Sequence, residues 1–239
     1  MLLCFLIPAS LAFVPSADGQ VFDMDHPEKR GPSRVFGGFA LMAAVPQGEF
    51  ADQVGNGYGF GGNVVLPLGR SSPVGIRLDA GFLIYGHERK RVCFSSTIGC
   101  RLQLDLNTNN NIFVAGIGPQ LMLPKGAVRP YLTGSVGLAY LFTESSVEGS
   151  SDLSPFANTT NYDDFTFAWT GAAGVYIPVR RGRQPISIDL SARYHANGRA
   201  NYLREGSIRD NPDGSISFTP IQSDTNFWTW QLGLAFGGT

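Results

Sequence analysis

The stretch PISIDLSARYH, residues 185 to 195, alternates between apolar and polar side chains from Ile186 onward. Successive side chains of a β-strand point to opposite faces, so this spacing predicts a strand with one apolar and one polar face. The apolar face holds Ile186, Ile188, Leu190, Ala192 and Tyr194, and the polar face holds Ser187, Asp189, Ser191, Arg193 and His195.

The same alternation recurs along the chain, clearly so at residues 74–85 and 227–236. No stretch shows the 3.6-residue period of an amphipathic helix. The pattern predicts eight strands, at residues 34–45, 57–67, 74–88, 101–123, 129–143, 162–178, 185–200 and 222–236. In the fourth of these, the run from Asn107 to Asn111 interrupts the alternation and predicts a bulge or an extra turn.

The connections between these strands alternate in length. Those at 68–73, 124–128 and 179–184 are short, whereas those at 46–56, 89–100, 144–161 and 201–221 are longer. Short turns at one end and long loops at the other are typical of an up-and-down transmembrane barrel. We therefore predict an all-β fold, an eight-stranded antiparallel up-and-down transmembrane β-barrel over residues 34–239. Within the last loop, Pro212-Asp213-Gly214 predicts the tip of a protruding hairpin.

The composition agrees with this fold and excludes one class of partner. The 239 residues include 30 Gly, 17 Phe and 8 Tyr, which suit sheet and turns better than helix interiors. Lys and Arg number 18 against 19 Asp and Glu, so the chain lacks the basic excess with which proteins neutralise phosphates. Nucleic acid is not an expected partner.

Residues 1–14 form an apolar block that is followed by small residues up to Gly19. This order predicts a secretory signal at residues 1–19, cut before Gln20, and a periplasmic segment at 20–33. A membrane helix is the alternative, but the block is shorter than the roughly 20 residues that span a bilayer.

Cys93 and Cys100 remain once the signal is removed, and six residues separate them. In an exported protein, such a pair predicts a disulfide within the loop after the third strand. Two free thiols or a metal site are the alternatives.

The apolar faces carry most of their aromatic residues near the end of the long loops. Amphipathic rings collect where a membrane meets water, so this placement predicts an aromatic girdle on the outer wall. Its members are Tyr58, Phe60, Phe82, Tyr140, Phe142, Phe165, Phe167, Trp169, Tyr194, Trp228 and Trp230.

The polar faces of the third and seventh strands carry charges that point into the lumen. In a ring of eight strands these two lie opposite each other, in an interior that side chains alone can fill. Counted from the preceding turns, Arg77 matches Asp189 in height, and Asp79 lies near Arg193. Ion pairs across the lumen are therefore predicted, with His195 beside them.

With these features together, the chain resembles the small eight-stranded outer-membrane barrels of Gram-negative bacteria, the OmpA and OmpX class and the opacity-type adhesins. The resemblance implies an outer-membrane location, contact with outer-membrane lipid and lipopolysaccharide, and assembly by the barrel-assembly machinery. It also implies a monomer without cofactor, metal or catalytic residues, which acts as a structural or surface-interaction protein with a largely plugged polar lumen. An extracellular ligand would bind at the loops.

Three other functions stay open at this stage. A narrow pore would need an unobstructed lumen. An outer-leaflet lipid-modifying enzyme, similar to lipid A deacylases, would need a nucleophile and a base that face lipid, but His195 is predicted to face inward. A soluble ligand-binding barrel would need an apolar lumen. The G-x-G-x-x-G at residues 57–62 lies within a predicted strand, so no dinucleotide site is expected.

Overall fold

The computed structural model describes residues 35–69, 72–93, 103–123, 126–149, 157–180, 182, 185–211 and 215–237. The predicted signal and periplasmic segment, residues 1–33, lie outside this set. The pairing of Cys93 with Cys100 and the predicted hairpin tip at 212–214 lie outside it as well.

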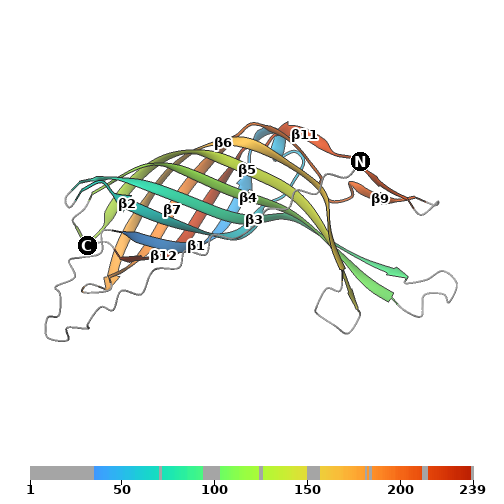
Figure 1. Ribbon diagram of the computed structural model, residues 1–239, viewed down its shortest axis with the longest axis horizontal. Coiled ribbons are helices and arrows are strands. Elements are labelled where there is room, and N and C mark those ends of the chain that lie inside the picture. The colour runs from blue at the N-terminus through green and yellow to red at the C-terminus, as the bar shows by residue number, and fades with distance from the viewer. Residues whose placement is uncertain are drawn as a thin grey trace, which may run out of the picture. The chain divides into compact units, whose positions relative to one another are not determined.

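Eight strands close into one antiparallel barrel, as predicted (Figure 1). Each strand pairs with its neighbours along the chain, and the last strand of the ring pairs with the first, from Phe36 opposite Gly237 to Pro46 opposite Phe227. The eight are β1 (Phe36–Pro46), β2 (Gly57–Pro67), β3 (Val74–Cys93), β4 (Gln103–Met122), β5 (Arg129–Gly149), β6 (Ala157–Arg180), β7 (Ile186–Asn197) and β12 (Phe227–Gly237).

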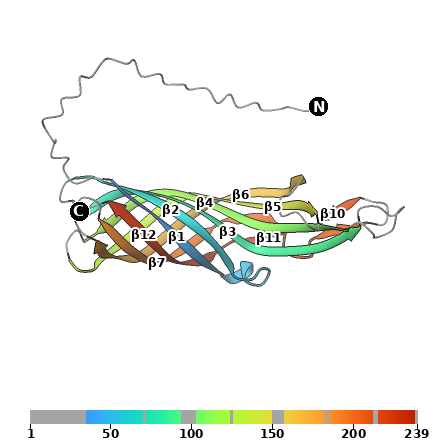
Figure 2. The same cartoon turned by 90° about the horizontal axis from the view of Figure 1, so that it is seen from below.

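Three strands, β3, β5 and β6, are longer than predicted. β3 runs to Cys93 and β5 to Gly149, so much of the chain predicted as loops at 89–100 and 144–161 is strand. β3, β4, β5 and β6 remain paired with one another beyond the ends of β2 and β7, and Figures 1 and 2 show them running past the rest of the barrel. Polar side chains occupy both faces there, and the apolar alternation that marks a membrane strand is reduced to Leu104 and Leu106 on β4. We call this part the protruding sheet.

The irregularity predicted in the fourth strand lies on its partner. β4 is continuous through Asn107–Asn111, whereas β3 shifts register between Ile84 and Gly86, opposite this run. Asn110 is buried and accepts a hydrogen bond of 2.7 Å from Thr143 on β5, so the asparagine run is held within the sheet.

The segment between β7 and β12 forms two small ribbons. β8 (Arg199–Tyr202) pairs with β11 (Ile221–Asp224), and β9 (Ile208–Asp210) pairs with β10 (Ile216–Phe218). The last barrel strand, predicted from residue 222, therefore begins at Phe227. The cause is local, because Asn197 donates its backbone N–H to Asn226 and its side-chain amide to the Thr225 carbonyl, which ends both barrel strands at this point.

The only helix in the described chain is the single-turn η1 (Gly48–Phe50), in the loop after β1. Among these residues no helix has the length and apolar character needed to cross a bilayer.

The lumen is filled in layers. Near the long-loop end, an apolar cluster surrounds Phe50, Tyr202 and Phe227. Near the short-turn end, a smaller cluster contains Phe36, Tyr131 and Tyr176 among others. Charged and amide side chains lie between, because alternate residues of every strand must face inward.

Gly137 on β5 marks a close approach of neighbouring backbones, since a Cβ atom there would overlap the carbonyl oxygen of Ala115 on β4. We expect Gly137→Ala to lower the free energy of unfolding by about 1–3 kcal/mol, the usual cost of overpacking. Urea unfolding in detergent micelles, followed by tryptophan fluorescence, measures the change. Gly134→Ala on the same strand is the control, because no atom lies within 4 Å of its added Cβ. Equal losses in the two variants would contradict the expectation.

Candidate functional site

The centre of the lumen is organised around Asp79 on β3. One oxygen, Oδ1, accepts Nε of Arg77 at 2.7 Å and Nη2 of Arg193 on β7 at 2.8 Å. Arg77 is 1% and Arg193 4% exposed, so both guanidinium groups are withdrawn from solvent and need a counter-charge. The structure thus brings Asp79 and Arg193 together across the lumen.

Arg77 also reaches two other strands. Its Nη1 donates to Gln120 on β4 and to the hydroxyl of Tyr176 on β6, both at 3.0 Å. Its guanidinium lies 5.3 Å from the ring centre of Tyr131, which stacks on Tyr176 at 4.6 Å. These contacts link four strands toward the short-turn end.

Asp189 does not form the expected ion pair with Arg77. Its carboxylate instead accepts the hydroxyl of Tyr131 at 2.7 Å, and Arg77 turns to Asp79 on its own strand. The predicted pair of Arg77 with Asp189 is wrong because barrel strands are tilted and staggered, so equal residue counts from the turns do not give equal heights.

His195 faces the lumen, with 4% of its surface exposed. Its ring stacks on Phe227 at 4.4 Å, and its two nitrogens lie 3.5 Å from the Thr170 hydroxyl and 3.3 Å from the Thr229 hydroxyl. Two cavities of about 20 Å³ each adjoin Asp79, Arg193 and His195.

An aromatic cap closes over the lumen at the long-loop end. Phe50 of η1 is 1% exposed, and its ring lies 5.2 Å from Tyr202, 5.7 Å from Tyr85 and 6.5 Å from Phe227. The hydroxyl of Tyr85 donates to the carbonyl of Leu203 at 3.0 Å. The cap was not predicted from the sequence; the available signals were Phe50 and Val54, two large apolar residues in a mostly polar loop.

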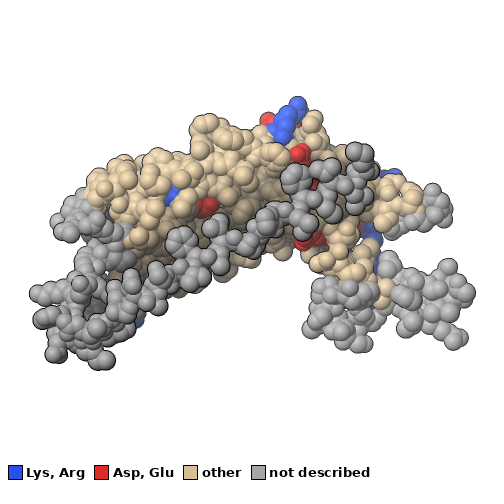
Figure 3. Space-filling model, viewed as in Figure 1, with Lys and Arg blue, Asp and Glu red and all other residues tan. Residues whose placement is uncertain are grey.

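The outer wall has the opposite character. Large apolar side chains are exposed along it, including Leu41 (68%), Phe165 (73%) and Trp169 (61%), and most of the visible wall in Figure 3 carries few charged atoms. All eleven residues predicted for the girdle lie on outward positions of their strands, and several of their rings are in contact.

Phe113 on β4 is an outward aromatic residue at the level of the girdle that the prediction omitted. It is 39% exposed and pairs in register with Phe82 on one side and Tyr140 on the other, so it lies between two predicted girdle members. The irregular alternation of the fourth strand hid its orientation.

Charges gather instead on the protruding sheet. Asp105 on β4 accepts Arg89 at 2.8 Å and Arg91 at 3.5 Å, both from β3. The hydrogen bond from Arg89, assisted by the charge of Arg91, holds the pKa of Asp105 below its usual range. The described residues contain no group of three or more His, Cys, Asp or Glu placed to hold a metal ion.

Cys93 is the last residue of β3, and its disulfide with Cys100 stays a prediction. We expect the intact mass of exported protein, measured without reductant, to be lower by two hydrogen atoms than that of the reduced protein. The bridge closes a short loop, so it should contribute less than the roughly 3 kcal/mol expected for a 15-residue loop. Two free thiols in exported protein would refute the bridge.

A closed ring of eight antiparallel strands, apolar outside and charged within, defines the class of small transmembrane β-barrels. No protein-family model matches the chain, and no curated protein matches it.

Solved structures of similar shape include the attachment invasion locus protein Ail of Yersinia pestis, with 13% identity, coverage of 85% of this chain and 97% of Ail, and a TM-score of 0.45. Neisserial surface protein A (NspA) has 13% identity, coverage of 86% and 97%, and a TM-score of 0.40. A major outer-membrane protein of Thermus thermophilus has 14% identity, coverage of 84% and 98%, and a TM-score of 0.40. The topology and the surface of this chain define its class.

Proposed function

We propose that this chain is an integral outer-membrane β-barrel without enzymatic activity, which acts as a structural or surface-interaction protein. One observation carries the proposal: the outer wall of the closed barrel exposes large apolar side chains, whereas Arg77, Asp189 and Arg193 are buried inside it. In water this arrangement would leave a large apolar surface unburied, whereas in a bilayer the same surface faces lipid. Outer-membrane lipid and lipopolysaccharide are then its surroundings, and assembly requires the barrel-assembly machinery.

The lumen of the proposed protein is plugged. The aromatic cap around Phe50 and the cluster around Asp79 support this view, because together they occupy two successive levels of the barrel. In a barrel of eight strands, the interior is just wide enough for side chains to fill. A monomer with such a lumen has its external surfaces, rather than a channel, available for function.

The surface for an extracellular ligand is the protruding sheet with the ribbons beside it. The sheet presents polar and charged side chains, among them Arg89 and Arg91, and stands beyond the apolar wall. A paired sheet holds such side chains at a fixed spacing. It is therefore better suited than a flexible loop to bind a ligand in the way that an adhesin does.

Purified protein is expected to need detergent and to migrate differently on a gel when it is not boiled, because a closed barrel has no strand edge at which unfolding by detergent begins. The measurement is electrophoresis of boiled and unboiled samples, together with light scattering in buffer without detergent. A monodisperse protein in buffer alone would overturn the proposed membrane location.

A further inference from the structure

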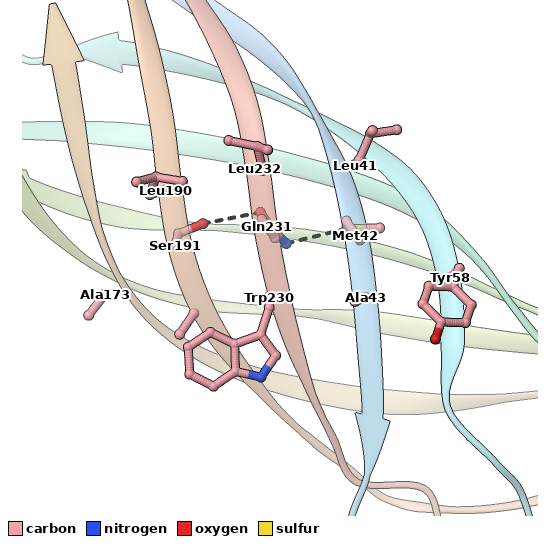
Figure 4. A pocket seen from close by; sticks show the side chains of 11 residues that line it. Leu41, Met42, Ala43, Tyr58, Ala173, Leu190, Ser191, Trp230, Gln231 and Leu232 are labelled. Atoms are coloured by element: carbon pink, nitrogen blue, oxygen red, sulfur yellow. Dashed lines mark hydrogen bonds between the residues drawn. The ribbon is translucent and has the colours of Figure 1, made fainter.

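A groove of about 600 Å³ lies in the outer wall over the neighbouring strands β2, β1, β12, β7 and β6 (Figure 4). Its floor is made of small side chains at outward positions. The register places Ala43 between Tyr58 on β2 and Trp230 on β12, and Trp230 pairs in turn with Ala192 on β7. The wall is hollowed at this level because small alanine side chains lie between the large ones.

Leucines bound the end of the groove nearer the short turns. Leu41, Leu232 and Leu190 are paired in register with one another, two residues along from the alanine row toward the short-turn end. They are 68%, 57% and 40% exposed and stand above the alanine floor. The leucine row therefore forms an apolar boundary of the groove at the end nearer the short turns.

The other end carries two hydrogen-bond donors. In Figure 4 the phenol oxygen of Tyr58 and the indole nitrogen of Trp230 point toward the end of the strands at which β1 terminates. Both side chains are exposed, at 67% and 59%, and within the described residues neither polar atom has a protein partner. Amphipathic rings place their polar atoms at the level of lipid headgroups.

We propose that this groove binds one lipid molecule, with an acyl chain on the alanine floor and an ester or headgroup oxygen accepting hydrogen bonds from Tyr58 and Trp230. The proposal rests on the membrane location proposed above. We infer a lipid because the groove is continuous with a wall that faces hydrocarbon. The hydrogen-bond donors lie at one end of the groove only, as the polar part of a lipid lies at one end of its acyl chain. Unlike the rest of the wall, which lipid covers without preference, this groove selects and orders a single chain.

The test compares two tryptophans of similar exposure, one in the groove and one outside it. The chain has three tryptophans, so one variant, W169F/W228F, retains Trp230, and another, W228F/W230F, retains Trp169 on β6. Each is placed in phosphatidylcholine vesicles with a small fraction of the same lipid brominated on its acyl chains. Lipids brominated at different positions along the acyl chain are used in turn. The quenching of each tryptophan is taken at the bromine position that quenches it most, so that a difference in depth between the two tryptophans does not affect the comparison.

We expect Trp230 to be quenched about threefold more strongly than Trp169 at low brominated fraction, a preference of about 0.7 kcal/mol and within the range of one net hydrogen bond. Ala43→Leu fills the floor between the two donors and should remove the excess, as should Tyr58→Phe in part. Ala80→Leu, at an outward position of β3 away from the groove, is the matched control and should leave the excess unchanged.

The outcomes separate the two proposals. If both tryptophans are quenched in proportion to the brominated fraction, the membrane location stands and the lipid site is wrong. If neither is quenched, the membrane location itself fails. If Ala43→Leu instead abolishes a crosslinked dimer and no excess quenching exists, a second copy of the chain occupies the groove and the lipid site is again wrong.

Discussion

Replacing Asp79 with alanine is expected to lower the free energy of unfolding by about 3–5 kcal/mol, which is the cost of leaving a buried charge without its partner. The effect is large because one carboxylate oxygen serves both Arg77 and Arg193, so a single substitution removes the ion-pair partner of two buried guanidinium groups. Urea unfolding in micelles, followed by tryptophan fluorescence, gives the free energy from the midpoint and slope.

Two controls separate this role from general damage. Asp224 lies 3.9 Å from Arg199 in an exposed pair, so Asp224→Ala should change stability by no more than about 1 kcal/mol. Asp189→Asn keeps an oxygen that accepts the Tyr131 hydroxyl and should cost less than Asp79→Ala. If the Asp79 variant is no less stable than either control, the central role of Asp79 is wrong.

The Phe50→Ala variant is expected to lose about 3–5 kcal/mol of unfolding free energy. Both this variant and the wild-type barrel should conduct ions poorly in a planar bilayer, because the charged cluster around Asp79 still fills the next level of the lumen. Phe50 contacts three aromatic rings from three different segments, so its removal leaves a cavity at the centre of the cap. Urea unfolding measures the first effect and single-channel recording the second.

Phe218→Ala is the control for this variant, because Phe218 is 40% exposed on β10 and belongs to neither lumen cluster. It should leave both stability and conductance close to wild type. Large and steady conductance of the wild-type protein would contradict the plugged lumen and favour the narrow pore.

The strands within the wall could be predicted because the bilayer imposes a contrast between their faces. At β2 the predicted and observed bounds coincide, Gly57–Pro67. Outside the wall that contrast disappears: the Asn107–Asn111 run is polar at every position, so alternation gives no signal even though the chain stays in strand.

The interior was harder to predict than the wall. Alternation alone shows that Arg77, Asp79, Asp189 and Arg193 face inward, and the structure places them there. Which of them meet depends on strand tilt and stagger, which no local pattern encodes. The cap depends on a contact between Phe50 and Tyr202, residues far apart in the sequence that meet only when the barrel has closed.

The seam between β1 and β12 has a consequence for the order of folding. Closing the hairpin of β3 and β4 joins Cys93 to Gln103, whereas closing the seam joins Pro46 to Phe227 across nearly the whole chain. The loop closed at the seam is longer than the hairpin loop by roughly four successive doublings of length. Its closure therefore costs about 2.5 kcal/mol more in lost chain entropy. Neighbouring hairpins should therefore form early, and the seam should close last and slowly. Until then β1 and β12 are apolar edge strands with unpaired backbone groups, and such edges recruit other chains unless they are shielded.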